Sequence, residues 1–280
     1  METNNPVLAR MEREAKTNGG YAGFGATTTA TAAPVDAAIT QQQYDATSTA
    51  QPGVLGPTLT IPDVIAKSAL MFVIVVAFAT VSWQMEINYG LIILSMLGGL
   101  GLGLWAAFSK KVRPGLYLAY AALMGFAIGG ISLWYSTWAT ENGAESNIVY
   151  QAVIGTFAAF AAMLFLYTTR IIKVTGTFKK AMAIAMFAYL GIAIVSLISS
   201  FFGVGEGWGF YGVGGLGILL CVAGVGLASF SLALDFDAIE TAVKGGAPER
   251  ESWRCAFGLT VTLIWLYLEL LRLLAILNSD

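Results

Sequence analysis

The sequence predicts an all-α membrane protein with seven transmembrane helices. Of its 280 residues, 57% are hydrophobic and only 11% are charged, whereas soluble domains carry about 25% charged residues. After residue 60 the chain is a series of seven apolar runs, each near the roughly 20 residues that a helix needs to cross a bilayer. Basic residues fall in every second gap between these runs, which is typical of a multi-pass membrane protein.

The first sixty residues differ from the rest of the chain. The stretch from Thr17 to Thr60 is rich in Thr, Ala, Gly, Gln and Ser and contains no Lys or Arg. Such a composition cannot bury enough apolar surface to offset the entropy lost on ordering. The acidic residues Glu2 and Glu12, with no apolar core after them, argue against a signal peptide. We therefore expect a disordered cytoplasmic tail over 1–60 and a transmembrane domain over 61–280.

The apolar runs are continuous rather than alternating, which favours helices over the strands of a β-barrel. Each gap between them contains charged residues, Gly or Pro. The expected spans are roughly 64–83, 90–108, 115–138, 148–170, 181–202, 212–237 and 254–277.

Two patterns within the spans predict how the helices pack. Gly125 and Gly129 in the third span have the spacing of small residues that lets two helices approach closely. Thr260, Thr262 and Tyr267 interrupt the otherwise apolar last span. We therefore expect this span to be enclosed by protein and to be the least lipid-exposed of the seven.

The distribution of charge predicts the orientation of the chain. The basic residues that flank the spans lie before the first span and around the second, fourth and sixth loops: Lys67, Lys110, Lys111, Arg113, Arg170, Lys173, Lys179, Lys180, Lys244, Arg250 and Arg254. The other three loops contain only acidic charges. Because cytoplasmic loops are enriched in Lys and Arg, we expect a plasma-membrane protein with its N-terminus in the cytoplasm and its C-terminus outside.

Several function classes are excluded by composition. The chain has no His, which removes His-based catalysis and His metal sites. A net charge of −2 means that the chain lacks the excess of basic residues that nucleic-acid-binding proteins carry. The two cysteines, Cys221 and Cys255, form neither a disulfide framework nor a zinc site. Gly212 to Gly217 matches a dinucleotide-binding pattern, but that motif needs a preceding strand. The last span has no Lys for a retinal Schiff base, and no cofactor is expected.

Ionisable residues within the spans are the candidates for function, because a central carboxylate costs about 2.5–3.5 kcal/mol on insertion scales. Asp235 and Asp237 in the sixth span point about 200° apart on a helix, so at most one faces the bundle axis. The alternative is that they, like Glu240, are solvated at the headgroup zone. Glu269 lies near the outer end of the last span, where Arg272 is placed to pair with it. We expect a snorkelling pair at the helix end there.

Several stretches of the chain resemble sequences of one known protein family. They are Asn5–Val7, Gly20–Gly25, Leu59–Lys67, Gln151–Phe157, Leu234–Glu240, Gly246–Pro248 and Gly258–Glu269. Together they resemble the actinobacterial branch of the Bax inhibitor-1/YccA-like family over nearly the whole chain. This resemblance implies a seven-helix fold with the last helix central and the other six around it. It also implies a pH-sensitive calcium leak across the membrane.

In better-studied branches of that family an aspartate pair, one on each of the last two helices, closes the pore and senses protons. The sixth-helix member corresponds to Asp235, which lies four residues before Ile239, and Thr262 stands at the place of the seventh-helix member. The resemblance implies a pH sensor at Asp235, whereas the seventh-helix aspartate does not carry over. We expect the ion pathway at Asp235, Asp237 and Thr262, with Asp235 as a ligand of Ca²⁺. Secondary candidates are Glu240, Glu269 and Arg272.

A cation leak with the lipid bilayer and Ca²⁺ as partners is the first hypothesis. The alternative is a regulator without transport activity that binds a membrane protease or acts in a stress pathway, which the long N-terminal segment favours. An intramembrane aspartyl protease needs two facing aspartates, and the last span has no Asp. We therefore expect no enzymatic activity. Ion flux after deletion of residues 1–60 would separate the two hypotheses.

Overall fold

The computed structural model describes residues 56–85, 88–141 and 147–278. Within these ranges the chain forms helices and short connections without a named strand. Seven of the described helices are long and apolar enough to cross a membrane, which confirms the all-α class and the number of spans. The predictions for residues 1–55 lie outside the described part of the chain.

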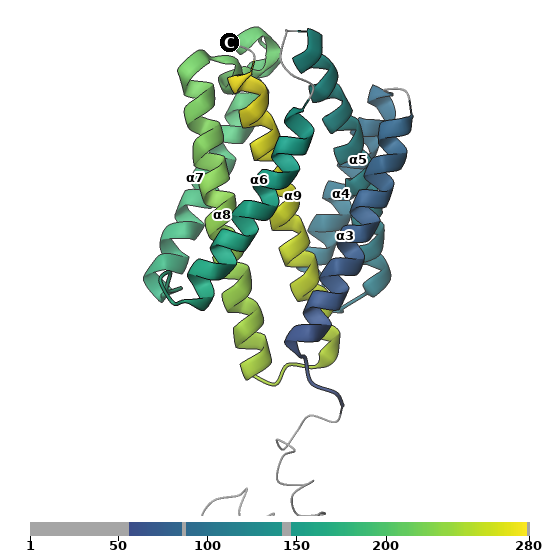
Figure 1. Ribbon diagram of the computed structural model, residues 1–280, viewed down its shortest axis with the longest axis vertical. Helices are drawn as coiled ribbons and strands as arrows, with labels where there is room; N and C mark the ends of the chain where they lie inside the picture. The colour runs from purple at the N-terminus through teal and green to yellow at the C-terminus, as the bar shows by residue number, and fades with distance from the viewer. Residues whose placement is uncertain (1–55, 86–87, 142–146, 279–280) are drawn as a thin grey trace, which may run out of the picture. The chain divides into compact units, whose positions relative to one another are not determined.

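The long helices among the described elements alternate in direction along the vertical axis of Figure 1. They are α3 (Ile61–Gln84), α4 (Tyr89–Phe108), α5 (Pro114–Glu141), α6 (Ile148–Thr168), α7 (Gly176–Ser200), η1 (Val204–Gly207), η2 (Gly209–Gly212), α8 (Gly214–Lys244), η3 (Glu249–Glu251) and α9 (Ser252–Leu277).

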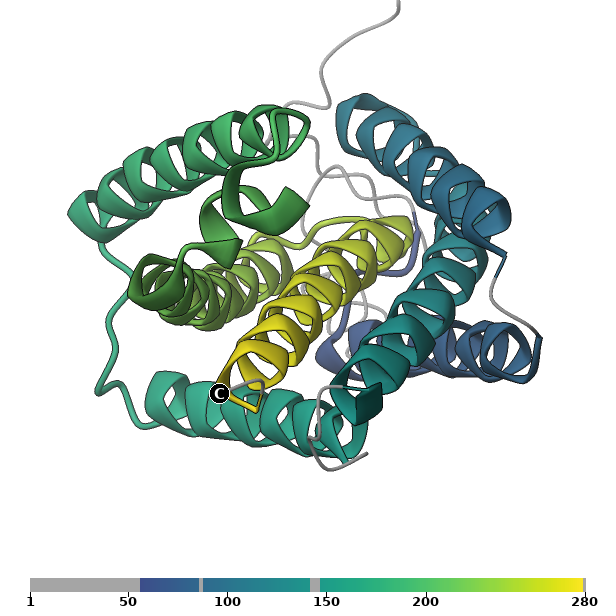
Figure 2. The ribbon, with the colours of Figure 1, turned by 90° about the horizontal axis from the view of Figure 1, so that it is seen from above.

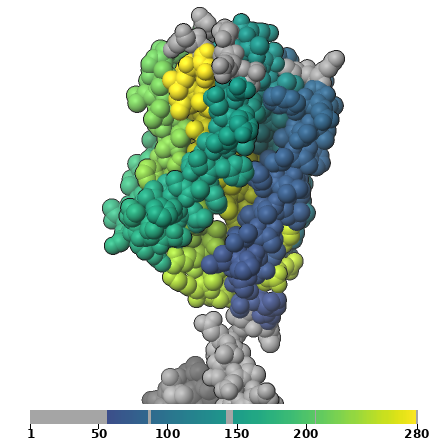
Figure 3. Space-filling model, in the orientation of Figure 1, coloured from purple at the N-terminus to yellow at the C-terminus, as the bar shows by residue number. Residues whose placement is uncertain are grey.

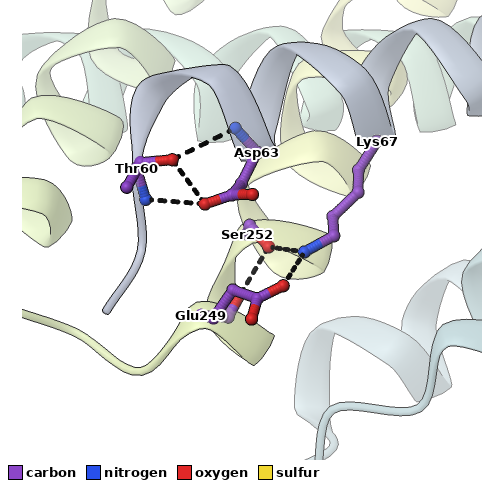
Figure 4. Close-up of polar contacts among 5 residues, drawn as sticks. All are labelled: Thr60, Asp63, Lys67, Glu249 and Ser252. Atoms are coloured by element: carbon purple, nitrogen blue, oxygen red, sulfur yellow. Dashed lines mark hydrogen bonds and ion pairs between the residues drawn. The ribbon is translucent and has the colours of Figure 1, made fainter. Parts of the chain in front are cut away.

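Local capping sets where these helices begin. Thr60 caps α3, since its hydroxyl accepts a hydrogen bond from Asp63 N, while the Asp63 carboxylate accepts from Thr60 N at 3.1 Å (Figure 4). This reciprocal pair satisfies two backbone donors that a helix start leaves free. Thr175 caps α7 by accepting from Phe178 N at 3.2 Å. The fifth span therefore begins at Gly176, earlier than the predicted 181, because a polar cap rather than hydropathy fixes its start.

The sixth span ends later than predicted. α8 continues to Lys244, beyond the expected end at 237, because its last turns carry charged residues that pair with one another. Lys244 and Glu240 form an ion pair one turn apart, which supports a helix in polar surroundings. Asp235 consequently lies well inside α8.

Glycines let α5 lie directly on α3. A Cβ atom added at Gly129 would lie 2.2 Å from Ala79 O, and one added at Gly125 would lie 2.5 Å from Val75 O. Both distances are far below van der Waals contact, so only glycine permits this backbone approach. The predicted small-residue contact is confirmed. α4 in turn packs against α5.

The last helix runs between two groups of helices. α9 packs against α3, α5, α6 and α8, and Figure 2 shows it between α8 on one side and α5 on the other. α4 packs on α5 instead, and α7 reaches α9 through the Tyr189 side chain. The described contacts therefore fall short of six helices packed directly around the last one.

The expectation that the last span is the least exposed holds over the whole helix but not in its most apolar part. Buried residues occupy 11 of the 26 positions of α9 and 11 of the 28 positions of α5, whereas in the most apolar window of each helix 50% of α5 is buried against 44% of α9. The reason is that α5 has neighbours on three sides, namely α3, α4 and α9. Its glycines also bring the α3 backbone unusually close.

The chain just before α3 is held against the loop between α8 and α9. Leu59 N donates to Ala247 O at 2.8 Å, and Glu249 N donates to Pro57 O at 2.9 Å. Lys67 Nζ donates to Ser252 Oγ at 2.6 Å and pairs with Glu249 Oε1 at 3.2 Å (Figure 4). Residues 57–60 therefore contact the loop that precedes α9, and the domain boundary after residue 60 stays a prediction.

Candidate functional site

Asp235 faces the last helix. Its Oδ1 atom lies 3.7 Å from the position of a Cβ atom added at Gly258, and Thr262 lies one turn further along the same face of α9, close to that carboxyl group. Thr262 Oγ1 also donates to Gly258 O at 3.2 Å. Two residues 27 positions apart in the chain (262 − 235) thus lie close to each other between α8 and α9.

One oxygen of this carboxyl group has no hydrogen-bond partner. Asp235 Oδ2 is buried, and none of the described residues donates to it. A buried polar atom without a partner costs about 1–3 kcal/mol, and more if it is charged. Such an atom within a membrane-spanning helix marks a candidate functional site. The Oδ2 atom is therefore free to accept a hydrogen bond or a proton.

The surroundings of Asp235 do not form a cage for a metal ion. Among the described residues, no group of three or more His, Cys, Asp or Glu side chains is placed to hold one. Ca²⁺ is usually held by six to eight oxygen ligands. In the described part of the chain, the expected role of Asp235 as a metal ligand therefore has no supporting cluster of carboxylates.

Asp237 and Glu240 point away from Asp235. Asp237 Oδ2 pairs with Lys179 Nζ of α7 at 2.6 Å. Glu240 Oε1 pairs with Arg170 Nη2 at 2.8 Å, and Glu240 also accepts from the Tyr167 hydroxyl. Both carboxylates thus join α8 to its neighbours at the end where the basic loops lie. The structure does not bring Asp237 together with Asp235 and Thr262, and the headgroup interpretation fits Asp237 and Glu240.

Glu269 is buried, which corrects the expectation of a snorkelling pair. Glu269 is only 4% exposed. The carboxylate accepts from Tyr189 Oη at 2.9 Å, Trp265 Nε1 at 3.1 Å and Arg272 Nη1 at 3.1 Å. The prediction failed because α7 covers this part of α9, and a helical spacing within α9 carries no information about that cover. We call Tyr189, Tyr211, Trp265, Glu269 and Arg272 the Glu269 cluster.

The Glu269 cluster also holds the connection between α7 and α8. The Arg272 guanidinium lies 4.5 Å from the centre of the Tyr211 ring in η2, and Tyr211 Oη donates to Tyr189 Oη at 3.0 Å. Burial raises the pKa of the Tyr211 hydroxyl, so it remains a donor at neutral pH. A Cβ atom at Gly224 would lie 2.4 Å from Tyr189 Oη and 2.7 Å from Glu269 Cδ. The lack of a side chain at Gly224 of α8 therefore leaves the space that the Tyr189 and Glu269 side chains occupy.

The Glu269 cluster was largely missed by sequence reasoning. Trp265 lies four residues before Glu269, so helical spacing could have suggested this one contact. Tyr189 and Gly224 lie 80 and 45 positions earlier in the chain (269 − 189 and 269 − 224). Only the packing of α7 and α8 against α9 brings them to Glu269.

These features define a multi-pass membrane protein with seven membrane-spanning helices in its described part and an acidic residue held between the last two of them. A protein-family model described as "Bax inhibitor 1 like" matches residues 5–279 of the chain, and the chain belongs to this family. A search of curated proteins finds no match to this chain. Its place in the actinobacterial branch stays a prediction.

Proposed function

We propose that this protein is a cation leak whose Ca²⁺ conduction responds to protons at Asp235. The observation that supports this function best is the buried Oδ2 atom of Asp235, which lacks a donor among the described residues. Keeping such an atom within a membrane-spanning helix is costly. Family membership favours the same activity, since the resemblance described above implies a calcium leak.

The chemistry of the site suits passage of a cation better than its retention. The Asp235 carboxylate and the Thr262 hydroxyl supply oxygen atoms, which Ca²⁺ prefers. One carboxylate binds a divalent cation weakly, so the ion can leave again. Protonation removes the negative charge of Asp235 and with it the attraction for a cation. Conduction therefore depends on pH without any His.

Asp235→Asn tests this function directly. The substitution keeps the size of the side chain but removes its ionisation, so Ca²⁺ flux into proteoliposomes should lose its dependence on pH. Asp237→Asn is the matched control, because Asp237 makes an ion pair with Lys179 and does not face α9. It should keep the wild-type pH profile. If wild type and Asp235→Asn respond to pH identically, Asp235 is not the sensor.

The orientation proposed for this leak follows the positive-inside rule. The N-terminus lies in the cytoplasm and the C-terminus lies outside the plasma membrane. In a variant with Cys221 and Cys255 replaced by Ala, we expect a cysteine introduced as Asp280→Cys to react with an impermeant thiol reagent on intact cells. A cysteine introduced as Lys111→Cys should react only after permeabilisation, and the reverse pattern would contradict this orientation.

A further inference from the structure

The chain just before α3 pairs with the connection between α8 and α9. Thr58 and Pro248 form an isolated antiparallel bridge, and the two backbone hydrogen bonds described above flank it. Leu59 is buried, whereas Pro57, Thr58 and Pro248 are exposed. Figure 3 shows the purple start of α3 beside the yellow-green residues around the α8–α9 connection. This contact is therefore held mainly by backbone groups at the surface.

Lys67 joins the same connection to α3 through its side chain (Figure 4). Its Nζ atom donates to Ser252 Oγ at 2.6 Å, pairs with Glu249 Oε1 at 3.2 Å and lies 5.8 Å from the centre of the Trp253 ring. The Lys67 side chain is 17% exposed, and Ser252 is completely buried. One side chain of α3 thus contacts both the connection and the first turn of α9.

The two helices that the connection joins are fixed to different neighbours. The last turns of α8 are tied to α7 by the ion pair of Asp237 with Lys179. The first turn of α9 is tied to the end of α4, because Arg254 Nη2 donates to Ser109 O at 3.1 Å. A separation of α8 from α9 at this end therefore needs free chain length in the connection. Pairing with the chain before α3 removes part of that length.

The Asp235 site lies a short way along both helices from this connection. Asp235 and Thr262 are each ten residues from the nearer end of the connection (245 − 235 and 262 − 252), or about 15 Å of helix. On α9, Cys255 and Gly258 share the face of Thr262. Both are half-buried, whereas the two residues between them are buried. The face of α9 that leads from the connection toward Asp235 therefore keeps some exposure.

We propose that Pro57–Thr60 and Lys67 form a latch that positions the start of α9 against α8 and so keeps the Asp235 site closed. While the latch holds the connection, α9 stays close to α8 at Asp235 and Cys255. When the latch releases, the connection gains the free length that lets the two helices separate from this end. Surface contacts with little buried apolar area open more readily than a packed interior. The effect of the latch on Ca²⁺ flux rests on the proposed function, whereas the movement does not depend on it.

Labelling of Cys255 tests the movement. In a Cys221→Ala background Cys255 is the one cysteine of the chain, and the full chain is held in phosphatidylcholine nanodiscs with a water-soluble maleimide. Lys67→Glu replaces the ion pair with repulsion from Glu249, so the labelling rate should rise at least about fivefold. Lys67→Glu with Glu249→Lys restores the pair and should return the rate to that of wild type.

Two further variants complete this test. Lys180→Glu makes the same change of charge at an exposed lysine of α7 and should leave the labelling of Cys255 unchanged. Lys67→Met, which only removes the charge, serves if Lys67→Glu does not fold. Equal labelling rates in wild type and in the Lys67 variant would overturn the proposal.

A disulfide across the latch tests its effect on flux. Residues that face each other in an antiparallel pair have Cα atoms about 4.5–5.5 Å apart, which suits a disulfide. With Cys221 and Cys255 replaced by Ala, Thr58→Cys with Pro248→Cys should cross-link on oxidation. Ca²⁺ flux into proteoliposomes should then fall at least about tenfold, because the open state is no longer reached, and a reductant should restore it. Thr58→Cys alone should not respond to oxidation.

The two measurements separate the latch from the conduction. Equal flux before and after complete cross-linking would contradict a latch that controls the Asp235 site. Absence of flux from wild type, together with faster labelling of Cys255 in Lys67→Glu, would refute the proposed function and support the latch.

Discussion

Arg272→Ala is expected to destabilise the protein by about 3–5 kcal/mol, because it leaves a buried carboxylate without its charged partner. Glu269, that carboxylate, is 4% exposed, and Arg272 is the basic residue with which it forms an ion pair, at 3.1 Å. Tyr189 and Trp265 continue to donate to it, but neither neutralises its charge. Loss of Arg272 also removes the contact with the Tyr211 ring in η2. The free energy of unfolding in mixed micelles measures the effect.

Lys179→Ala is the control for Arg272→Ala. It also breaks an ion pair, with Asp237, but the Lys179 side chain is 53% exposed, and exposed pairs are worth about 0–1 kcal/mol. Replacing both members of the pair, as Glu269→Gln with Arg272→Leu, should recover most of the loss, because no charge is then left buried and the Gln amide oxygen can still accept from Tyr189 and Trp265. Equal effects of Arg272→Ala and Lys179→Ala would show that the Glu269 cluster is solvated.

Much of the fold could be predicted because hydropathy is a local property. Seven runs of suitable length predict seven spans, and the structure has them. The ends of α7 and α8 were misplaced because a cap at Thr175 and a charged pair at Glu240 extend these helices beyond their apolar parts. The hydropathy of the sequence does not predict how far such polar turns extend a helix.

The site was predictable only where one helix carries the information or a resemblance supplies the partner. Asp235 stood out as an acidic residue in an apolar span, and Thr262 followed from the family pattern and the helical rise. The burial of Glu269 could not be predicted, because Tyr189 covers it from α7 and Gly224 makes room for it on α8. Neither residue lies near Glu269 in the sequence.

Thr262→Asp is expected to move the pH response of Ca²⁺ flux upward by about one unit or more, because it places a second carboxylate opposite Asp235. Two like charges in one buried site repel, so the pair keeps a shared proton to higher pH. Flux into proteoliposomes over a series of pH values gives the midpoint. An unchanged midpoint would mean that residue 262 does not act on Asp235.

The pH dependence of Ca²⁺ flux in the double variant Asp235→Asn with Thr262→Asp tests the role of this site most directly. The double variant moves the single carboxylate from α8 to α9 across the same contact. We expect it to restore the pH dependence that Asp235→Asn alone removes, without the upward shift that Thr262→Asp alone produces. A flat pH profile in the double variant, or an upward shift as large as in Thr262→Asp alone, would contradict the proposal that Asp235 and residue 262 form one proton-responsive site.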